Sequence, residues 1–204
     1  MARISLLLWD IGGVLLSNGW DHGSREAAVR HFGLDGAEFE KRHAQVESDF
    51  ERGRIDWDQY LEATVFYTPR AFLPGAVRSF AESRSTAIVP NLDLARRLRT
   101  RREWTMATLN NESRQLNDYR IRTFGLRDVF DVFFSSGYTG RRKPDPAAYE
   151  YALRLTQRLP EETIFIDDRP ENVAAAAALG LRTVLMRDPA QLRNDLASAG
   201  VAAS

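Results

Sequence analysis

Five short apolar runs, most of them separated by segments with helical patterning, constrain the fold of this chain more than any other feature. The runs are Ile4–Trp9, Trp104–Leu109, Val132–Phe134, Thr163–Ile166 and Thr183–Met186. Short apolar runs bounded by turn residues are typical of buried strands, and strands that alternate with helices form parallel sheets. The sequence therefore predicts an α/β fold, a doubly wound parallel sheet with helices on both faces.

The helices between these runs are marked by start and stop signals. Asp145 followed by Pro146 is typical of an N-cap and a first helical residue, while Gly125 and Gly180 each follow a helical pattern and end it. We expect helices over Asn91–Arg102, Glu112–Phe124, 146–158 and Pro170–Leu179.

A different organisation is expected between the first two runs. From about Ser17 to Ile88 the sequence contains no convincing strand, only helical patterns around Ser24–Phe32, Ala37–Arg52 and Trp57–Tyr67. About seventy residues are far too many for a simple crossover, so we interpret residues 17–85 as a helical insertion above the sheet edge. Residues 1–16 and 86–204 would then form the core domain.

Carboxylates stand at the ends of two of the predicted strands. Asp167 and Asp168 close the fourth run, and Asp10 closes the first. The carboxyl ends of parallel strands meet at one sheet edge, where open α/β sheets bind their ligands. Because adjacent buried carboxylates are costly without a positive partner, the sequence predicts a divalent metal there.

Composition excludes several classes of function. The chain has 28 Lys and Arg and 28 Asp and Glu, so nothing in its net charge favours a nucleic acid or a membrane surface as partner. It has no cysteine, which excludes disulfides, thiolate nucleophiles and cysteine-ligated metals. The first apolar run is too short for a signal peptide core or a membrane span, so we expect a cytoplasmic protein. We expect this protein to be a monomer or a homodimer.

Four ordered motifs carry a resemblance to a known family. They are Asp10-Ile11-Gly12-Gly13-Val14 after the first run, Asn110-Asn111 after the second, then Lys143-Pro144, and Asp167-Asp168 after the fourth. Together they resemble the motifs of the haloacid dehalogenase-like (HAD) hydrolase superfamily, whose core is a Rossmann-like sheet. The insertion resembles the C1-type cap of one subgroup, and the Asp-x-Gly first motif is closest to certain sugar-phosphate phosphatases.

The resemblance implies roles for the residues of these motifs. Asp10 would be the nucleophile that attacks phosphorus and forms an aspartyl-phosphate. Lys143 would contact this nucleophile and the transferring phosphoryl group and offset their negative charge. Asn110 stands where the family usually has a hydroxyl residue that binds a phosphate oxygen, and its amide N–H can donate the same bond. Asn111 is the usual asparagine of the motif, also expected at the phosphate.

The same resemblance implies a magnesium site. Its ligands would be the Asp10 carboxylate, the Gly12 backbone carbonyl and Asp168, with Asp167 reaching the ion through water. Carboxylate, carbonyl and water oxygens are the ligands that Mg²⁺ prefers.

Gly12 departs from the family pattern. Most phosphatases of the superfamily have an aspartate there, which protonates the leaving group and then activates water; its loss costs on the order of 10²–10⁴ in rate. Three explanations stay open: a substrate with a good leaving group, a substitute such as Asp21 or His22, or a protein that turns over slowly or not at all. His22 is therefore a candidate substrate contact, whereas His31 and His43 fall in helical patterns typical of surface or half-buried positions.

The sequence supports three hypotheses of function. The first is a Mg²⁺-dependent phosphatase acting on a small phosphorylated metabolite, possibly a sugar phosphate. The second is a 2-haloacid dehalogenase, which uses the same aspartate on carbon without a metal; the Asp167-Asp168 pair argues against it. The third is a phosphate-binding regulatory protein with little turnover, which Gly12 alone supports.

Overall fold

The computed structural model describes residues 2–202, and in this part of the chain one five-stranded sheet forms the centre of the fold. The strands are β1 (Leu6–Trp9), β2 (Thr105–Asn110), β3 (Val132–Ser135), β4 (Thr163–Asp167) and β5 (Arg182–Leu185). Their order is β3-β2-β1-β4-β5, and every neighbouring pair is parallel. The predicted parallel α/β fold is confirmed.

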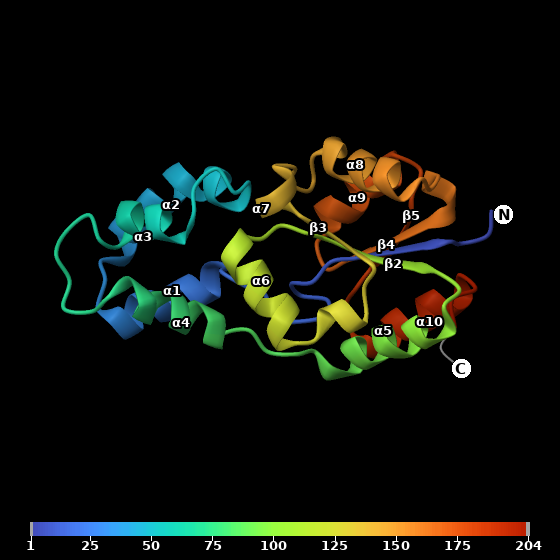
Figure 1. Ribbon diagram of the computed structural model, residues 1–204, viewed down its shortest axis with the longest axis horizontal. Coiled ribbons are helices and arrows are strands. Elements are labelled where there is room, and N and C mark those ends of the chain that lie inside the picture. Colours follow the sequence, from blue (N-terminus) through green and yellow to red (C-terminus); the bar gives the residue numbers. More distant parts are fainter. Residues whose placement is uncertain (1, 203–204) are drawn as a thin grey trace.

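Helices cover both faces of this sheet (Figure 1). On one face lie α5 (Val89–Arg101) and α10 (Pro189–Ser198), and on the other α8 (Pro146–Thr156) and α9 (Pro170–Ala178). In β1 Leu7 and Trp9 pack with the first pair of helices, whereas Leu6 and Leu8 pack with the second. Burial on both sides explains why the strands are continuously apolar rather than alternating.

The remaining core elements are short or lie at the edge of the sheet. They are α6 (Arg114–Thr123), η1 (Leu126–Asp128), α7 (Ser136–Thr139) and η2 (Pro160–Glu162). No helix within residues 2–202 is long and apolar enough to cross a membrane.

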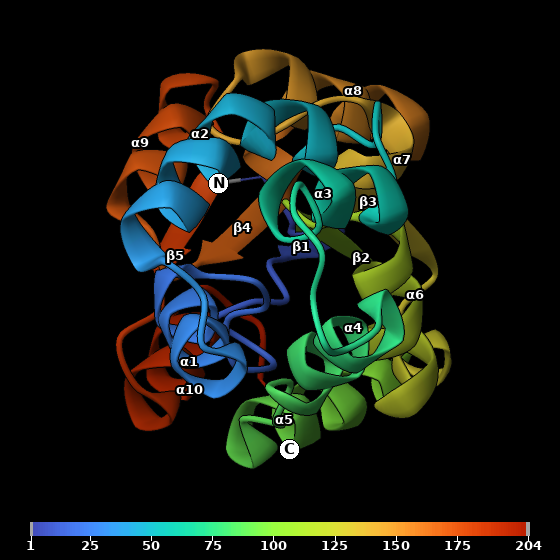
Figure 2. The ribbon, with the colours of Figure 1, turned by 90° about the vertical axis from the view of Figure 1, so that its left-hand side faces the viewer.

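A helical insertion joins β1 to β2, as the sequence predicts. It comprises α1 (His22–Phe32), α2 (Gly36–Glu51), α3 (Trp57–Thr64) and α4 (Pro74–Ser83), which lie beyond one end of the sheet (Figures 1 and 2). The insertion has its own aromatic core, in which Phe50 stacks on Tyr60 with ring centroids 4.1 Å apart. The boundaries expected at residues 16/17 and 85/86 stay a prediction.

Capping residues fix most of the insertion helices. Asp21, Asp35 and Asp56 each accept a hydrogen bond from the backbone N–H three residues later. The sequence analysis began α1 two residues late. It missed α4 altogether, because Leu73 at its N-cap has no side chain that could cap a helix and only Pro74 marks its start.

Candidate active site

The three predicted carboxylates meet where β1 and β4 end. These strands are neighbours in register, with Trp9 beside Ile166, and the Asp10 N–H donates to the Ile166 carbonyl at 2.8 Å. As a result Asp10, Asp167 and Asp168 each offer a carboxylate oxygen within 4.8 Å of the others. Asp167 is the last residue of β4 rather than the first beyond it, and it is fully buried.

Lys143 lies within this carboxylate cluster. Its Nζ is 3.0 Å from Asp10 Oδ1 and 2.7 Å from Asp167 Oδ2, and the residue is 3% exposed. Asn111 holds its backbone: the Lys143 N–H donates to Asn111 Oδ1 at 2.9 Å, and Asn111 Nδ2 donates to the Lys143 carbonyl at 2.8 Å. In this structure Asn111 positions Lys143, and its expected contact with phosphate stays a prediction.

Burial and mutual repulsion disturb the titration of these groups. Burial raises the pKa of Asp10 to about 7; the charges of Asp167 and Asp168 add to the rise, while Lys143 opposes it. Burial alone would lower the pKa of Lys143, but Asp10 and Asp167 outweigh it and raise that pKa above its ordinary value. The cluster is therefore short of positive charge.

The cluster fits a hard divalent cation. Three ionised carboxylates and one ammonium leave an excess of negative charge that a dication offsets, and oxygen ligands are those that Mg²⁺ prefers. Asp168 Oδ1 is buried yet has no hydrogen-bond partner among residues 2–202. Such an atom is costly unless something binds it. The Gly12 carbonyl stays a predicted ligand of this cation.

Asn172 completes the surroundings of Asp167, and the sequence analysis missed it. Its Nδ2 lies 3.1 Å from both Asp167 oxygens, and the Arg169 N–H donates to Asp167 Oδ1 at 2.8 Å. With Lys143 also bound, Asp167 has donors on both oxygens, whereas Asp168 keeps one free. This difference supports Asp168 as the direct metal ligand. The available signal was an asparagine in the first turn of the helix after the aspartate pair.

Asn110 reaches the site from the end of β2. Its Nδ2 donates to Asn117 Oδ1 at 3.1 Å, and its own Oδ1 is buried without a hydrogen-bond partner in the described chain. The two amides could exchange these roles by rotation, which would free the N–H groups of Asn110. Asn110 lines the cavity described next, but its expected bond to phosphate stays a prediction.

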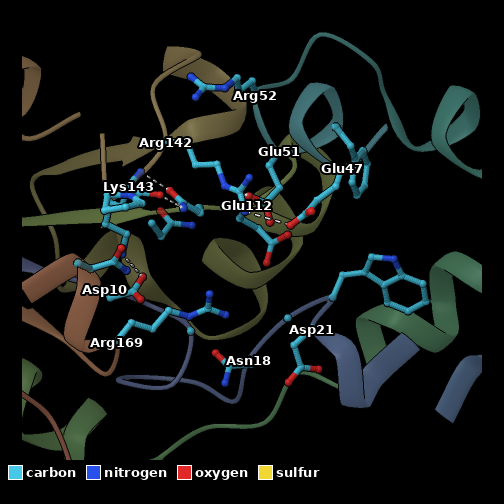
Figure 3. Close-up of a pocket in the computed structure, with 18 of the residues that line it drawn as sticks. Asp10, Asn18, Asp21, Glu47, Glu51, Arg52, Glu112, Arg142, Lys143 and Arg169 are labelled. Carbon is cyan, nitrogen blue, oxygen red and sulfur yellow. Dashed lines mark hydrogen bonds and ion pairs between the residues drawn. The ribbon is translucent and has the colours of Figure 1, made fainter. Parts of the chain in front are cut away.

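A cavity of about 560 Å³ opens over Asp10 between the core and the insertion. Figure 3 shows Asp10 and Lys143 on one side of it and Glu47, Glu51 and Glu112 across from them. The side chains that the insertion contributes are mostly polar or aromatic; they include Trp20, Arg25, His43, Glu47, Phe50, Glu51 and Arg52.

The two histidines on this cavity differ from what their sequence positions indicate. The His22 side chain is 66% exposed and pairs with Glu26 and Glu40 at the rim, so its expected substrate contact stays a prediction. His43, expected at the surface or half buried, is only 6% exposed and its Nδ1 lies 2.9 Å from the Tyr60 hydroxyl. That hydroxyl accepts from Trp20 Nε1 at 2.8 Å, so its own hydrogen is directed to His43 Nδ1. The neutral ring then carries its proton on Nε2.

Arg142 connects the loop of Lys143 to the insertion. Its Nη2 lies 3.0 Å from Glu47 Oε1 and its Nε 2.5 Å from Glu51 Oε2, both on α2. Nothing in the sequence pairs Arg142 with carboxylates about ninety positions earlier.

Comparisons with known proteins agree with this geometry. A family model described as haloacid dehalogenase-like hydrolase matches residues 4–180. Drimenol cyclase of Aspergillus calidoustus is 27% identical over 210 residues, which cover 95% of this chain and 36% of the cyclase. Flavin mononucleotide hydrolase 1 of Arabidopsis thaliana is 27% identical over 168 residues, covering 79% of this chain and 65% of the hydrolase. This chain thus spans about a third of the first relative and just under two thirds of the second.

A solved structure shares the fold. A HAD family enzyme from Bacteroides thetaiotaomicron, in complex with magnesium and inorganic phosphate, has a TM-score of 0.78 and 22% identity, covering 90% of this chain and 94% of that chain. This likeness extends to the fold alone. The family match is broader evidence, because it spans residues 4–180, the range in which all four motifs lie, and by that match this chain belongs to the haloacid dehalogenase-like hydrolases.

Proposed function

We propose that this chain is a Mg²⁺-dependent phosphatase that hydrolyses a small phosphorylated metabolite through an aspartyl-phosphate on Asp10. The observation that carries the proposal is the position of Lys143. Its Nζ lies 3.0 Å from Asp10 Oδ1 within a cluster of three carboxylates, which puts a fixed positive charge where a phosphoryl group would meet the nucleophile.

The hydrogen bonds of Asp10 indicate which of its oxygens attacks. Oδ1 accepts from the Ile11 N–H at 2.7 Å and faces Lys143. Both contacts fall on Oδ1, so Oδ2 is the oxygen free to attack phosphorus. The bond from phosphorus to the leaving oxygen then breaks, and water later hydrolyses the aspartyl-phosphate to regenerate the carboxylate.

The metal would be held by Asp10, Asp168 and the Gly12 carbonyl, with Asp167 nearby. When bound, Mg²⁺ would neutralise phosphoryl oxygens as charge develops on them. The Bacteroides enzyme, solved with magnesium and inorganic phosphate, supports the choice of metal, and the name of the flavin mononucleotide hydrolase supports hydrolysis of a phosphate ester.

The cavity supports a small and polar substrate. Its volume of about 560 Å³ suits a metabolite, and α2 presents His43, Glu47 and Glu51 to it, so that both donors and acceptors are available to hydroxyl groups. We therefore extend the proposal to a sugar phosphate as substrate and to residues 17–85 as a C1-type cap that selects it.

One set of assays tests the proposal. The purified protein is incubated with nitrophenyl phosphate and a panel of sugar phosphates, with Mg²⁺ and with EDTA, beside Asp10→Asn. Asp128→Asn, on an exposed turn, is the matched control. We expect metal-dependent phosphate release that Asp10→Asn abolishes and the control retains, and acid quenching should trap phosphate on Asp10.

Two other outcomes would contradict it. Halide release from a 2-haloacid without metal would indicate a dehalogenase. Binding of phosphate esters without turnover would indicate a regulatory protein.

A further inference from the structure

Gly12 leaves the proposed reaction without an acid at the place next to the nucleophile. An alkyl phosphate, a sugar phosphate among them, expels an alkoxide that is far too basic to leave without a proton at neutral pH. The cavity must then supply a proton from another side chain, or the protein must be restricted to activated substrates.

Other groups fill the space beside Gly12. A Cβ built on Gly12 would lie 3.2 Å from Asn18 Oδ1 and 3.8 Å from Arg120 Nη1. Arg120 comes from α6, is 2% exposed, and donates to the Ser17 carbonyl. Its Nη1 also lies 3.4 Å from Glu112 Oε2. The Glu112 carboxyl group therefore lies near the place that a side chain at position 12 would occupy, and the Arg120 guanidinium contacts both.

The fold makes room for this carboxyl group. Glu112 is 6% exposed and lines the same cavity as Asp10. Its Oε1 accepts from the Ser113 N–H at 3.0 Å, while a Cβ on Gly19 would lie only 2.2 Å from its Oε2. Only a glycine at position 19 is compatible with the Glu112 carboxyl in this place.

Burial, aided by the charge of Glu51, favours the protonated form of Glu112. The charged groups that face it are Arg120 from α6 and Glu51 from the end of α2. Burial raises the pKa of Glu112 to about 7; Arg120 opposes the rise and Glu51 adds to it. A carboxyl group that titrates near neutral pH can both give and accept a proton under working conditions.

We propose that Glu112 is the catalytic acid and base of this site and replaces the side chain that Gly12 lacks. The inference rests on the proposed phosphatase activity. As Asp10 Oδ2 bonds to phosphorus and the ester bond breaks, the leaving oxygen takes the electron pair of that bond and the proton of Glu112, and departs as an alcohol. The Glu112 carboxylate then accepts a proton from the water that attacks the aspartyl-phosphate. Phosphate leaves, and both side chains return to their initial states.

The test is the dependence of rate on the leaving group. Glu112→Gln keeps the shape of the side chain but removes the acid. We expect kcat/KM for alkyl phosphates to fall on the order of 10²–10⁴. The loss should be much smaller for nitrophenyl phosphate, whose leaving group needs no proton. Glu150→Gln, exposed on α8, is the control and should behave as the wild type.

A second variant separates catalysis from structure. Gly12→Asp places a carboxyl group beside the proposed nucleophile, where the nearest atoms belong mainly to the side chains of Asn18 and Arg120. Combined with Glu112→Gln, it should restore turnover of alkyl phosphates. The limb of the pH–rate profile that reports ionisation of the catalytic carboxyl group should also shift in this double variant, because a different carboxyl group then gives and accepts the proton. Thermal unfolding with and without Mg²⁺ should confirm that each variant is folded.

Three results would overturn the inference. A loss in Glu112→Gln that is equal for all leaving groups would indicate a structural role. If the wild type hydrolyses alkyl phosphates and Glu112→Gln hydrolyses them at the same rate, Glu112 is excluded as the acid while the phosphatase proposal stays intact. A wild type that hydrolyses no phosphate ester at all, nitrophenyl phosphate included, would overturn both.

Discussion

The replacement of Asp10 by asparagine should stabilise the metal-free protein, although it removes the proposed nucleophile. Asparagine has nearly the same shape but no charge. In the wild type the ionised Asp10 lies beside Asp167 and Asp168, and Lys143 is the one ammonium in contact with it in the described chain. Removing one of the three clustered negative charges relieves their repulsion.

The size of the effect follows from the pKa of Asp10. Burial raises it from 3.8 to about 7, with the neighbouring carboxylates adding to the rise. The folded protein thus holds this proton more tightly than the unfolded chain. The resulting stability is complete below pH 3.8 and is lost as the pH rises through about 7. At about 1.4 kcal/mol per pH unit, ionised Asp10 costs at most about 4 kcal/mol at pH 8. Because Asp10→Asn also takes a partner from Lys143, we expect a net gain of about 2–3 kcal/mol.

The assay is urea unfolding in EDTA at pH 5 and pH 8, followed by circular dichroism. The advantage of Asp10→Asn should grow from pH 5 to pH 8 and should correspond to a rise in Tm of roughly 5–10 °C at pH 8. Asp128→Asn should change stability by less than about 0.5 kcal/mol at either pH. A variant that is less stable than the wild type at pH 8, or an advantage that does not depend on pH, would refute the reasoning.

Three further predictions concern other parts of the site. Lys143→Met should destabilise the protein by about 3–5 kcal/mol in urea unfolding, because two buried carboxylates lose their cation, and it should abolish phosphatase activity. Mg²⁺ should raise the Tm of the wild type by several degrees in thermal unfolding. Asp168→Asn should remove most of that rise, because it takes away the carboxylate whose Oδ1 is buried without a hydrogen-bond partner in the described chain. Tyr60→Phe should cost about 2–6 kcal/mol in urea unfolding, because the Trp20 indole and the His43 imidazole both lose the hydroxyl between them, each at about 1–3 kcal/mol.

The sequence predicts the sheet and the carboxylate cluster well, because both depend on local patterns. A buried strand needs a continuous apolar run, and a parallel sheet brings the ends of its strands to one edge, so that Asp10 and Asp167 had to meet. Asn172 and Glu112 were harder to recognise. Glu112 directly follows the Asn110-Asn111 motif and Asn172 comes four residues after Asp168, but a glutamate or asparagine near the start of a helix is ordinary in sequence, and only burial in the folded chain makes it unusual.

The side chains of the insertion that line the cavity could not be predicted, because they depend on how α2 is oriented. His43, Glu47 and Glu51 are spaced four residues apart and so share one face of that helix. Which face meets the cavity is decided elsewhere, by the ion pairs of Arg142 and by the hydrogen bond from Ser136 Oγ to the Glu51 carbonyl at 2.6 Å. Arg142 also precedes Lys143, which contacts the proposed nucleophile Asp10. The loop that carries Lys143 therefore also orients the face of α2 that we propose selects the substrate, and a change at Arg142 should affect KM through α2 before it affects the proposed attack of Asp10.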